Sequence, residues 1–541
     1  MASRHKRIAM AQLDFLVGDI AGNAARILDA VVTARDKHKA DLIIFPELAL
    51  TGYPPEDLLL RPGFLENADA ALDELTSQVR GIDVVLGHTY VTGTRLCNAV
   101  SVLSGGERVG PYLKQSLPNY TVFDEKRYFS PGNEPLVVEL GGVSVGILIC
   151  EDIWEPLPAR MAADAGADIL IVVNASPWFR EQDAERDSAL QARFRDTQKM
   201  IVYVNTVGGQ DDLVFDGQSR VVDGSGEIAL QAPAFKEGLF LVDLDVEAGT
   251  ANPAGWETEE LDDDEMVYRA LVTGLRDYVE KNGFPLVLLG LSGGIDSALT
   301  LAIAVDALGP ERVYAVMMPT RYTADMSVDD ARSMAEAFGV RYSVIPIEEV
   351  YGAFLGTLSE TFAGYAVDVT EENIQARCRG IVLMALANKL GGMVLATSNK
   401  SETAVGYTTL YGDMCGGYAP IKDVYKTLVY RLVRHRNRHS QVIPERVLER
   451  APSAELAHDQ KDQDSLPPYD LLDAILERYV ERDCSIETII EEGFDRAVVE
   501  RVAAMVLRNE YKRRQSAPGT RITKRAFGRD RRYPITSGWK G

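Results

Sequence analysis

The first half of the chain alternates short apolar runs with longer amphipathic stretches. Apolar positions recur every three or four residues over 20–39, 64–79, 158–166 and 183–198, and this period predicts helices. The runs between them are short, rich in Val and Ile, and typical of buried strands. Strands are expected at RIAMAQLDF, ADLIIFPE, IDVVLGHTYV, VSVGILIC, ADILIVVNAS and MIVYVNTVGG.

The pattern changes after Gly217. Hairpin-like strands are expected around Asp223-Gly224, followed by a last strand, GLFLVDLD. The next stretch, NPAGWETEELDDDE, is strongly acidic and has no strand pattern, which predicts a linker that leads into a helix with an acidic first turn near Glu259. The expected divisions are a first domain at 1–247, a linker at 248–262 and a second domain at 263–541.

A second α/β pattern fills the rest of the chain, without an internal repeat. Because the two halves differ in pattern, two separate chemistries are expected. The predicted elements are a strand at 285–291, a helix at 296–308, the strand VYAVMMP, a helix at 328–338, the strand YSVIPI, a helix at 371–389 and the strand GMVLATS.

Composition narrows the class of protein. The 541 residues carry a net charge of -23, which disfavours nonspecific nucleic-acid binding. The five cysteines are scattered and form no CxxC, which argues for a reducing compartment and against a disulfide framework or a zinc site of that type. No apolar run approaches the length of a membrane span, and Asp14 comes too early for a signal peptide. We expect a cytoplasmic protein with no membrane or nucleic-acid partner.

Three residues of the first half suggest a nucleophilic site. Glu47 ends ADLIIFPE, Lys114 follows VGPYL, and Cys150 ends VSVGILIC. In an α/β sheet, side chains at the carboxyl ends of strands converge on a ligand. A cysteine thiolate there attacks a carbonyl, a carboxylate takes the thiol proton, and an ammonium stabilises the resulting oxyanion. Taken singly, a Cys that ends an apolar strand is usually a small buried hydrophobic residue, and a lone Glu or Lys usually lies on the solvated surface.

The segments around these residues carry a family resemblance. FPELALTGYPPEDLL, YLKQSLPNYTVFDEKRYF, ILICEDIWEP and NASPWF resemble the nitrilase, or carbon–nitrogen hydrolase, superfamily across residues 5–245. The resemblance implies a four-layer α-β-β-α sandwich and hydrolysis of an amide through a Cys150 thioester. It maps the family's Glu-Lys-Cys triad onto Glu47, Lys114 and Cys150, and its glutamine contacts onto Tyr120, Ser176 and Gln182.

One position departs from that family. A glycine-lysine pair commonly follows NASP, whereas this chain has Glu181-Gln182. A lysine contact to glutamine is therefore not expected here. Arg180 or Arg186 could compensate, although this charged stretch also fits a solvated helix face.

The stretch LGLSGGIDSALTLAIAVDAL predicts strand, tight loop and helix, with backbone N–H groups pointing outward at the helix start. Such a corner suits an anion. The P-loop pattern GxxxxGK[ST] is absent, because no Lys follows the glycines. SGGxDS instead resembles the phosphate loop of the ATP pyrophosphatases. Its glycines allow close approach of pyrophosphate, Ser292 and Ser297 offer hydroxyl donors, and Asp296 suits Mg²⁺.

Four further segments resemble NAD synthetases: ENIQARCRGIVLMALAN, LATSNKSETAVGYTTLYGDMCGGYAPIKDVYKT, APSAEL and DQKDQDSLPPYDLLD. The resemblance implies a doubly wound parallel α/β domain of the ATP-pyrophosphatase type, with Mg²⁺ at Asp296 and Glu402. It implies ATP contacts at Gly290, Leu291, Ser292, Gly293, Gly294, Ile295, Asp296, Ser297, Thr397, Lys426 and Ser453, and deamido-NAD contacts at Asn373, Glu402 and Lys512.

Together the halves resemble the glutamine-dependent NAD synthetases. That family converts the carboxylate of deamido-NAD into an adenylate with ATP, and displaces AMP with ammonia released from glutamine. Keeping this ammonia inside the protein keeps it unprotonated. The resemblance also implies a homo-oligomer, with an octamer among its candidate forms.

Two other classes of function stay open at this stage. The first is an amidotransferase with another acceptor, such as a nucleotide or a tRNA base; ENIQARCRG and SNKSETAVGYTT count against it. The second is a binding protein whose sites have decayed, which the intact Glu47, Lys114, Cys150, Asp296 and Glu402 oppose. The basic tail KRRQSAPGTRITKRAFGRDRRYP fits dinucleotide phosphate or a subunit contact better than nucleic acid, given the acidic whole.

Overall fold

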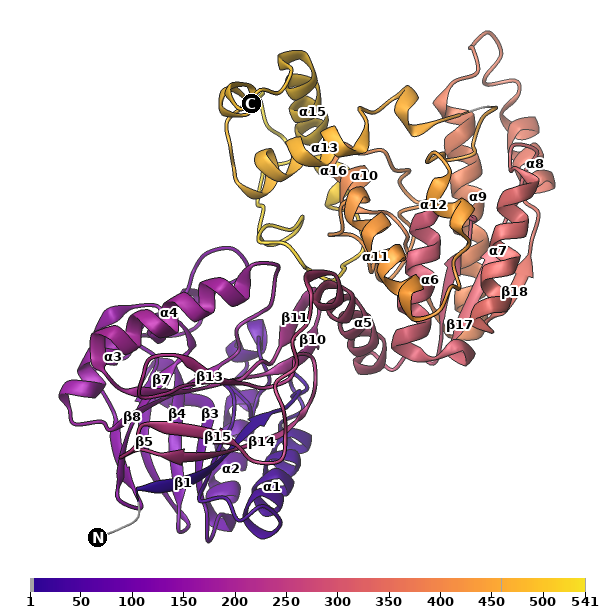
Figure 1. Ribbon diagram of the computed structural model, residues 1–541. Coiled ribbons are helices and arrows are strands. Elements are labelled where there is room, and N and C mark those ends of the chain that lie inside the picture. The colour runs from indigo at the N-terminus through magenta and orange to yellow at the C-terminus, as the bar shows by residue number, and fades with distance from the viewer. Residues whose placement is uncertain (1–3, 459, 541) are drawn as a thin grey trace. The chain divides into compact units, whose positions relative to one another are not determined.

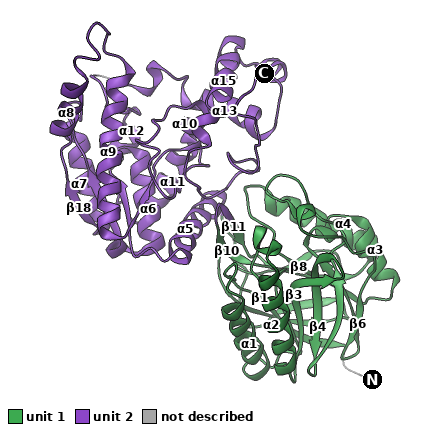
Figure 2. Cartoon of the chain, turned by 180° about the vertical axis from the view of Figure 1, so that it is seen from behind, with its two compact units in different colours: residues 1–210, 214–261 green, residues 211–213, 262–541 purple. Residues whose placement is uncertain are grey.

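The computed structural model describes residues 4–458 and 460–540 (Figure 1). The chain forms two compact units (Figure 2). The first comprises residues 1–210 and 214–261, and the second comprises residues 211–213 and 262–541. Each unit has its own sheets and its own core, as two different α/β patterns predict.

The first unit is built on two sheets. The seven-stranded sheet has the spatial order β15 (Thr250–Pro253), β14 (Gly238–Asp245), β1 (His5–Gln12), β2 (Leu42–Ile44), β3 (Asp83–Thr92), β4 (Arg95–Ser104) and β5 (Glu107–Leu113). The six-stranded sheet has the order β13 (Ile228–Gln231), β12 (Arg220–Val222), β9 (Met200–Asn205), β8 (Ile169–Asn174), β7 (Val143–Ile149) and β6 (Val137–Leu140). A separate hairpin pairs β10 (Val207–Gln210) with β11 (Leu213–Asp216).

Helices cover the outer faces of both sheets. The seven-stranded sheet packs against α1 (Ile20–Asp36) and α2 (Pro62–Gln78), and the six-stranded sheet packs against α3 (Pro156–Asp164) and α4 (Gln182–Thr197) (Figure 1). The unit is therefore the predicted four-layer α-β-β-α sandwich. All four predicted helices are present, with their bounds shifted by a few residues.

Burial on both faces explains why the strands are nearly continuous apolar runs. In β1, Ile8 and Met10 point into the core between the sheets, whereas Ala9 and Ala11 lie in the core beneath the helices. This alternation follows the two-residue period of a strand.

The structure differs from the sequence prediction at residues 250–253, inside the predicted linker. They form β15, which pairs antiparallel with β14. Three of the four residues in their sequence, TANP, are of types depleted in strands, so the pairing is set by the edge that β14 offers rather than by local preference. The helix expected near Glu259 starts at Asp263, and the carboxylate of Asp262 caps it by accepting from Glu265 N.

The second unit has one parallel sheet with the order β18 (Arg341–Val344), β17 (Val313–Met317), β16 (Val287–Gly290) and β19 (Met393–Leu395). In chain order this is 3-2-1-4, a doubly wound arrangement as predicted. The strand order reverses between β16 and β19, and ligands of such sheets bind at the carboxyl ends beside this reversal. The loop that follows β16 is SGGIDS.

Helices surround this sheet (Figure 1). One face shares a core with α8 (Glu348–Leu358) and α9 (Val369–Leu390). The helix α6 (Ile295–Leu308) packs against α5 (Asp263–Lys281) and α11 (Lys426–His439), and α7 (Asp325–Phe338) lies beside β17 and β18. The remaining helices are α10 (Lys400–Val405), α12 (Glu445–Glu449), α13 (Tyr469–Leu476), α14 (Ile486–Glu491), α15 (Arg496–Arg508) and α16 (Glu510–Arg513).

Candidate active sites

The fold brings Glu47 and Lys114 into direct contact. Lys114 Nζ donates to Glu47 Oε1 at 2.7 Å and to Glu125 Oε1 at 2.8 Å, and all three side chains are buried. Burial by itself lowers the pKa of Lys114, but the facing carboxylates of Glu125 and Glu47 raise it well above its usual value. The raised pKa favours the charged form of Lys114 in this buried site.

The Glu47 carboxylate is fixed from two sides. Asn98 Nδ2 donates to Glu47 Oε1 at 2.7 Å, and Ala175 N donates to Glu47 Oε2 at 3.0 Å. Ala175 belongs to the NASP segment, whose next residue is Ser176. The contact therefore ties Glu47 to a segment that the sequence assigns to glutamine binding.

Cys150 directly follows β7 and opens a 3₁₀ turn, Cys150–Ile153. Its φ of 43° lies in the left-handed region, which is strained for a residue with a side chain. Asp152 holds the turn by accepting from Ile149 N at 3.1 Å and from Ser116 N at 2.8 Å. Strain held in place by such bonds is typical of functional positions.

The Cys150 thiol is buried beside charged groups. Burial, followed by the Glu47 carboxylate, raises the pKa of Cys150 well above its usual value, while Lys114 opposes that rise. The raised pKa favours the neutral thiol, so attack on a carbonyl requires a base for its proton. These charge effects indicate that Cys150 lies near Glu47 and Lys114, and all three side chains are buried.

The three predicted glutamine contacts occupy different settings. Tyr120 is 53% exposed, and its hydroxyl donates to the Glu151 carboxylate at 3.0 Å. Ser176 is buried, and Gln182 is buried at the first position of α4. Arg186 lies within 3.4 Å of Ser176 Oγ, but its guanidinium is bound to Asp216 at 2.8 Å. Arg186 therefore carries a charge that is already paired.

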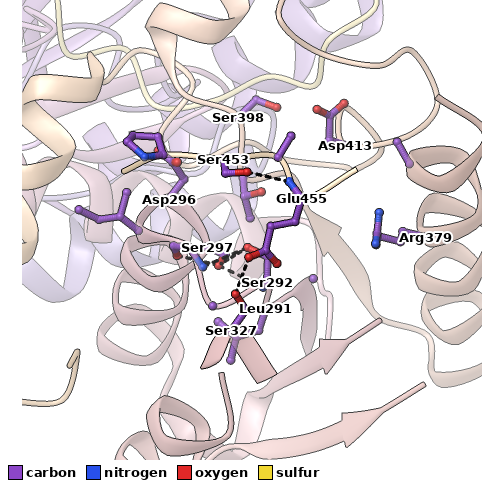
Figure 3. A pocket seen from close by; sticks show the side chains of 18 of the residues that line it. Leu291, Ser292, Asp296, Ser297, Ser327, Arg379, Ser398, Asp413, Ser453 and Glu455 are labelled. Atoms are coloured by element: carbon purple, nitrogen blue, oxygen red, sulfur yellow. Dashed lines mark hydrogen bonds between the residues drawn. The ribbon is translucent and has the colours of Figure 1, made fainter. Parts of the chain in front are cut away.

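The SGGIDS loop joins β16 to α6 as the sequence predicts (Figure 3). Gly293 has a φ of 81°, and a Cβ there would lie 2.4 Å from Ser327 O, so only glycine fits. Ser292 Oγ and Ser297 Oγ lie 3.1 Å apart, and Ser297 Oγ donates to Gly294 O at 2.9 Å. These bonds fix the conformation of the loop at the start of α6.

A cavity of about 270 Å³ opens at this loop. Figure 3 shows side chains from several elements around it, with Arg379 on the side away from Asp296. The predicted ATP and metal residues all line it: Gly290, Leu291, Ser292, Gly293, Gly294, Ile295, Asp296, Ser297, Thr397, Glu402, Lys426 and Ser453.

Two carboxylates meet a cation within the cavity. Lys426 Nζ lies 2.5 Å from Asp296 Oδ2 and 3.2 Å from Glu402 Oε1. Burial raises the pKa of Glu402 to about 8, and Lys426 opposes the rise. A positive charge therefore fits between these oxygens, and carboxylate oxygen is the donor that Mg²⁺ prefers. The residues present fit the metal that the family resemblance implies.

Asn373 and Lys512 do not line the cavity. Lys512 Nζ donates to Gly406 O and to Thr408 O, each at 2.9 Å. Asn373 Oδ1 accepts from Thr409 Oγ1 at 2.7 Å. The two predicted deamido-NAD contacts therefore converge on one segment, 406–409, whose Tyr407 reaches the cavity.

The structure adds residues that the sequence analysis did not single out. Glu125 joins the Lys114 cluster, and burial raises the pKa of this carboxyl to about 7. Arg379 lines the cavity, and burial lowers the pKa of its guanidinium to about 10. Asn399 donates to the Asp296 carboxylate and accepts from the backbone N–H of Glu402. Each of these residues lies in a segment that carries the family resemblance. The sequence therefore marked the segments, but it did not show which of their side chains meet at a site.

Comparison with known proteins matches both units. Residues 7–252 match the family model for carbon-nitrogen hydrolase, and residues 267–516 match that for NAD synthase. The chain is 51% identical over 544 residues to the glutamine-dependent NAD(+) synthetase of Xylella fastidiosa (strain Temecula1), with 100% of each chain covered. It is 45% identical over 563 residues to that of Aquifex aeolicus, covering 98% of this chain and 99% of the relative.

A solved structure agrees over the same length. Glutamine-dependent NAD+ synthetase from Acinetobacter baumannii, in complex with adenosine diphosphate, matches with a TM-score of 0.81 and 48% identity, and 99% of each chain is covered. Fold and site thus define a carbon–nitrogen hydrolase joined to an NAD synthase. The chain belongs to the glutamine-dependent NAD(+) synthetase family. Among the described residues, no helix is long and apolar enough to cross a membrane.

Proposed function

We propose that this protein is a ligase that amidates deamido-NAD to NAD at the expense of ATP, with glutamine as the nitrogen donor. The observation that carries the proposal is the presence of two sites in one chain. One is a buried Cys150–Glu47–Lys114 cluster suited to amide hydrolysis. The other is a cavity whose phosphate loop faces a carboxylate pair. The glutaminase domain is assigned to 1–247 and the synthetase domain to 263–541.

In the glutaminase domain, Glu47 takes the proton of the Cys150 thiol as sulfur attacks the side-chain amide of glutamine. The Lys114 ammonium stabilises the oxyanion that forms. Collapse of this intermediate breaks the carbon–nitrogen bond, and the nitrogen leaves as ammonia with the proton that Glu47 returns. Water activated by the same carboxylate then hydrolyses the thioester to glutamate.

In the synthetase domain, the nicotinic acid carboxylate of deamido-NAD attacks the α-phosphorus of ATP and releases pyrophosphate. Ammonia attacks the resulting adenylate and displaces AMP. The N–H groups of the Gly290–Ser297 loop and the Lys426 ammonium bind phosphate oxygens. When bound at Asp296 and Glu402, Mg²⁺ would supply charge neutralisation to the phosphates.

The remaining residues are assigned to binding. Glutamine contacts are proposed for Tyr120, Ser176 and Gln182. A relative solved in complex with adenosine diphosphate supports binding of an adenine nucleotide, and ATP contacts are proposed for Thr397 and Ser453, which line the cavity. Deamido-NAD contacts are proposed for Asn373, Glu402 and Lys512, and the shared segment 406–409 supports placing the first and last of these together.

The test of this function is turnover of deamido-NAD with ATP and either glutamine or ammonium. NAD, AMP and pyrophosphate are expected in equal amounts with both nitrogen sources. Turnover of another acceptor in place of deamido-NAD, with the same two nitrogen sources, would reassign the substrate. Absence of ATP-dependent pyrophosphate release with any acceptor would instead point to a binding protein.

Glutamine hydrolysis is expected to be coupled to synthesis, because one chain contains both an ammonia source and an ammonia consumer. About one glutamate per NAD is expected, and hydrolysis should quicken when deamido-NAD and ATP are present. The measurement is glutamate and NAD formed in the same reaction, with and without the synthetase substrates. A hydrolysis rate that ignores those substrates contradicts the coupling, and a large glutamate excess contradicts channelling.

Asn399 is expected to control the proposed metal site. Its Nδ2 donates to Asp296 Oδ1 and its Oδ1 accepts from Glu402 N, both at 2.9 Å. Loss of such a supporting contact typically weakens metal binding by about 10–100-fold. Asn399→Ala should therefore weaken Mn²⁺ binding, measured by paramagnetic resonance, and raise the Mg²⁺ concentration needed for synthesis.

A matched variant separates the positioning of Asp296 from the capping of α10. Asn399→Asp keeps the oxygen that caps Glu402 N but loses the donor to Asp296. If Asn399 positions Asp296, both variants should weaken the binding of the metal. Unchanged Mn²⁺ affinity in Asn399→Asp would leave Asn399 with only a capping role.

A reducing compartment, as in the cytoplasm, is proposed because all five cysteines are free. The homo-oligomeric state, with an octamer among its candidate forms, stays a prediction that analytical ultracentrifugation tests.

A further inference from the structure

Three metal-ligating side chains meet outside the cavity, within the second unit. His435 and His439 lie one turn apart on α11, and Glu265 lies in the first turn of α5. Glu265 Oε2 is 2.7 Å from His435 Nε2 and 4.0 Å from His439 Nε2. One ligand atom from each residue lies within 4.8 Å of the other two.

The geometry points to a transition-metal site, formed by His435, His439 and Glu265, that binds Zn²⁺. This site goes beyond the proposed function and needs no part of it. Two imidazoles and one carboxylate are a common zinc ligand set, which leaves a fourth position for water. Mg²⁺ prefers oxygen ligands, so the Asp296–Glu402 pair and this cluster differ in metal preference.

The ligand atoms are close to the arrangement that zinc needs. Zinc–nitrogen bonds of about 2.0–2.1 Å in a tetrahedron separate neighbouring ligand atoms by roughly 3.4 Å. His435 is already fixed, since its side chain is only 7% exposed and its Nε2 faces the carboxylate. His439 is 66% exposed, so rotation of its side chain brings Nε2 closer without repacking. The same exposure gives the metal a path from solvent.

The other Glu265 oxygen already has a partner. Arg269 Nε donates to Glu265 Oε1 at 2.5 Å, which orients the carboxylate and leaves Oε2 toward the imidazoles. An outer partner of this kind is usual behind a metal-bound carboxylate.

The surrounding charges also suit a cation. The histidines occupy the last two turns of α11, and the C-terminal end of a helix is the negative end of its dipole. Nearby, Arg431 pairs with Asp263 and Asp264 across the same two helices. The arginines of the last turn also face carboxylates, Arg436 that of Asp306 and Arg438 that of Asp262, so the added positive charge is not placed among unpaired cations only.

A bound Zn²⁺ would connect α5 to α11, which starts at Lys426 in the cavity. A ligand that binds the folded state alone raises its stability in proportion to occupancy. Zinc should therefore raise the melting temperature of the protein, while leaving the glutaminase residues untouched.

The test uses the full-length protein stripped of metal and titrated with ZnCl₂ by calorimetry. His439→Ala removes the exposed imidazole, and Glu265→Gln keeps the shape of the partly buried carboxylate. The wild type should bind one zinc ion per chain at this site, and each variant should lower the affinity for that ion by at least about tenfold. Even the loss of a contact behind a metal ligand usually costs that much. His38→Ala, which removes an imidazole from the first unit, is the matched control and should bind as the wild type does.

Co²⁺ provides a second readout. The wild type should show the intense visible absorption of tetrahedral cobalt, and His439→Ala should lose it. Zinc should raise the melting temperature of the wild type and of His38→Ala but not of His439→Ala. Equal zinc affinity and stoichiometry in all three proteins would overturn the site and leave His435–Glu265 as a structural ion pair.

Discussion

Cys150→Ala is expected to abolish glutamine-dependent NAD synthesis while ammonium-dependent synthesis stays near the wild-type rate. Cys150 is the proposed nucleophile, and it lies in the first unit, whereas the Gly290–Ser297 loop belongs to the second. Loss of a catalytic nucleophile costs on the order of 10⁴-fold or more in turnover. The measurement is NAD formation with each nitrogen source under saturating deamido-NAD and ATP.

Ammonium-dependent activity doubles as the folding control. Removing a buried sulfur typically costs about 1 kcal/mol of stability, which a folded domain tolerates. Glutamine-driven synthesis that persists in Cys150→Ala would overturn the assignment of the nucleophile.

Lys114→Ala and Glu47→Ala should show the same split. Their effects should be strongly non-additive with Cys150→Ala, because residues that act as one unit cannot be lost twice. Lys114 and Glu47 are in contact at 2.7 Å, so double variants can test whether they act in the same step as Cys150. Fully additive losses would mean that the three residues do not act in one step.

Asp296→Asn is expected to abolish NAD formation with both nitrogen sources. The substitution keeps the shape of the side chain but removes a negative charge that faces Lys426 and lies in the proposed metal site. Metal-ion stabilisation is worth several kcal/mol, which corresponds to a loss of at least about a hundredfold. The measurement is pyrophosphate release and NAD formation with ammonium.

Glutaminase activity is the control for this variant, because hydrolysis of glutamine takes place in the other unit. A part of it should survive in Asp296→Asn, measured as glutamate formed without synthetase substrates. Full ammonium-driven synthesis in this variant would show that the loop has another role.

Local pattern was sufficient for much of the fold. The spacing of apolar residues predicts the helices of the first unit, and the glycines of SGGIDS predict the loop between a strand and a helix. The structure contains all of these elements. Pattern failed at β15, because TANP becomes a strand only when β14 offers an edge. It also left out α8, which lies between the predicted strand YSVIPI and the predicted helix at 371–389, and the helices that follow GMVLATS, among them α11.

The sequence by itself determined which chemistry the chain carries, since Glu47, Lys114, Cys150 and the SGGIDS loop lie in segments whose order is specific to one family. Only the tertiary structure decided their partners. Buried charges need counter-charges, and these come from wherever the packed chain passes nearest. Glu125 reaches Lys114 in this way, and Glu265 reaches His435 across 170 positions of sequence. Such pairs leave no periodic signal, because their spacing in the chain is set by the path between elements and not by the elements themselves.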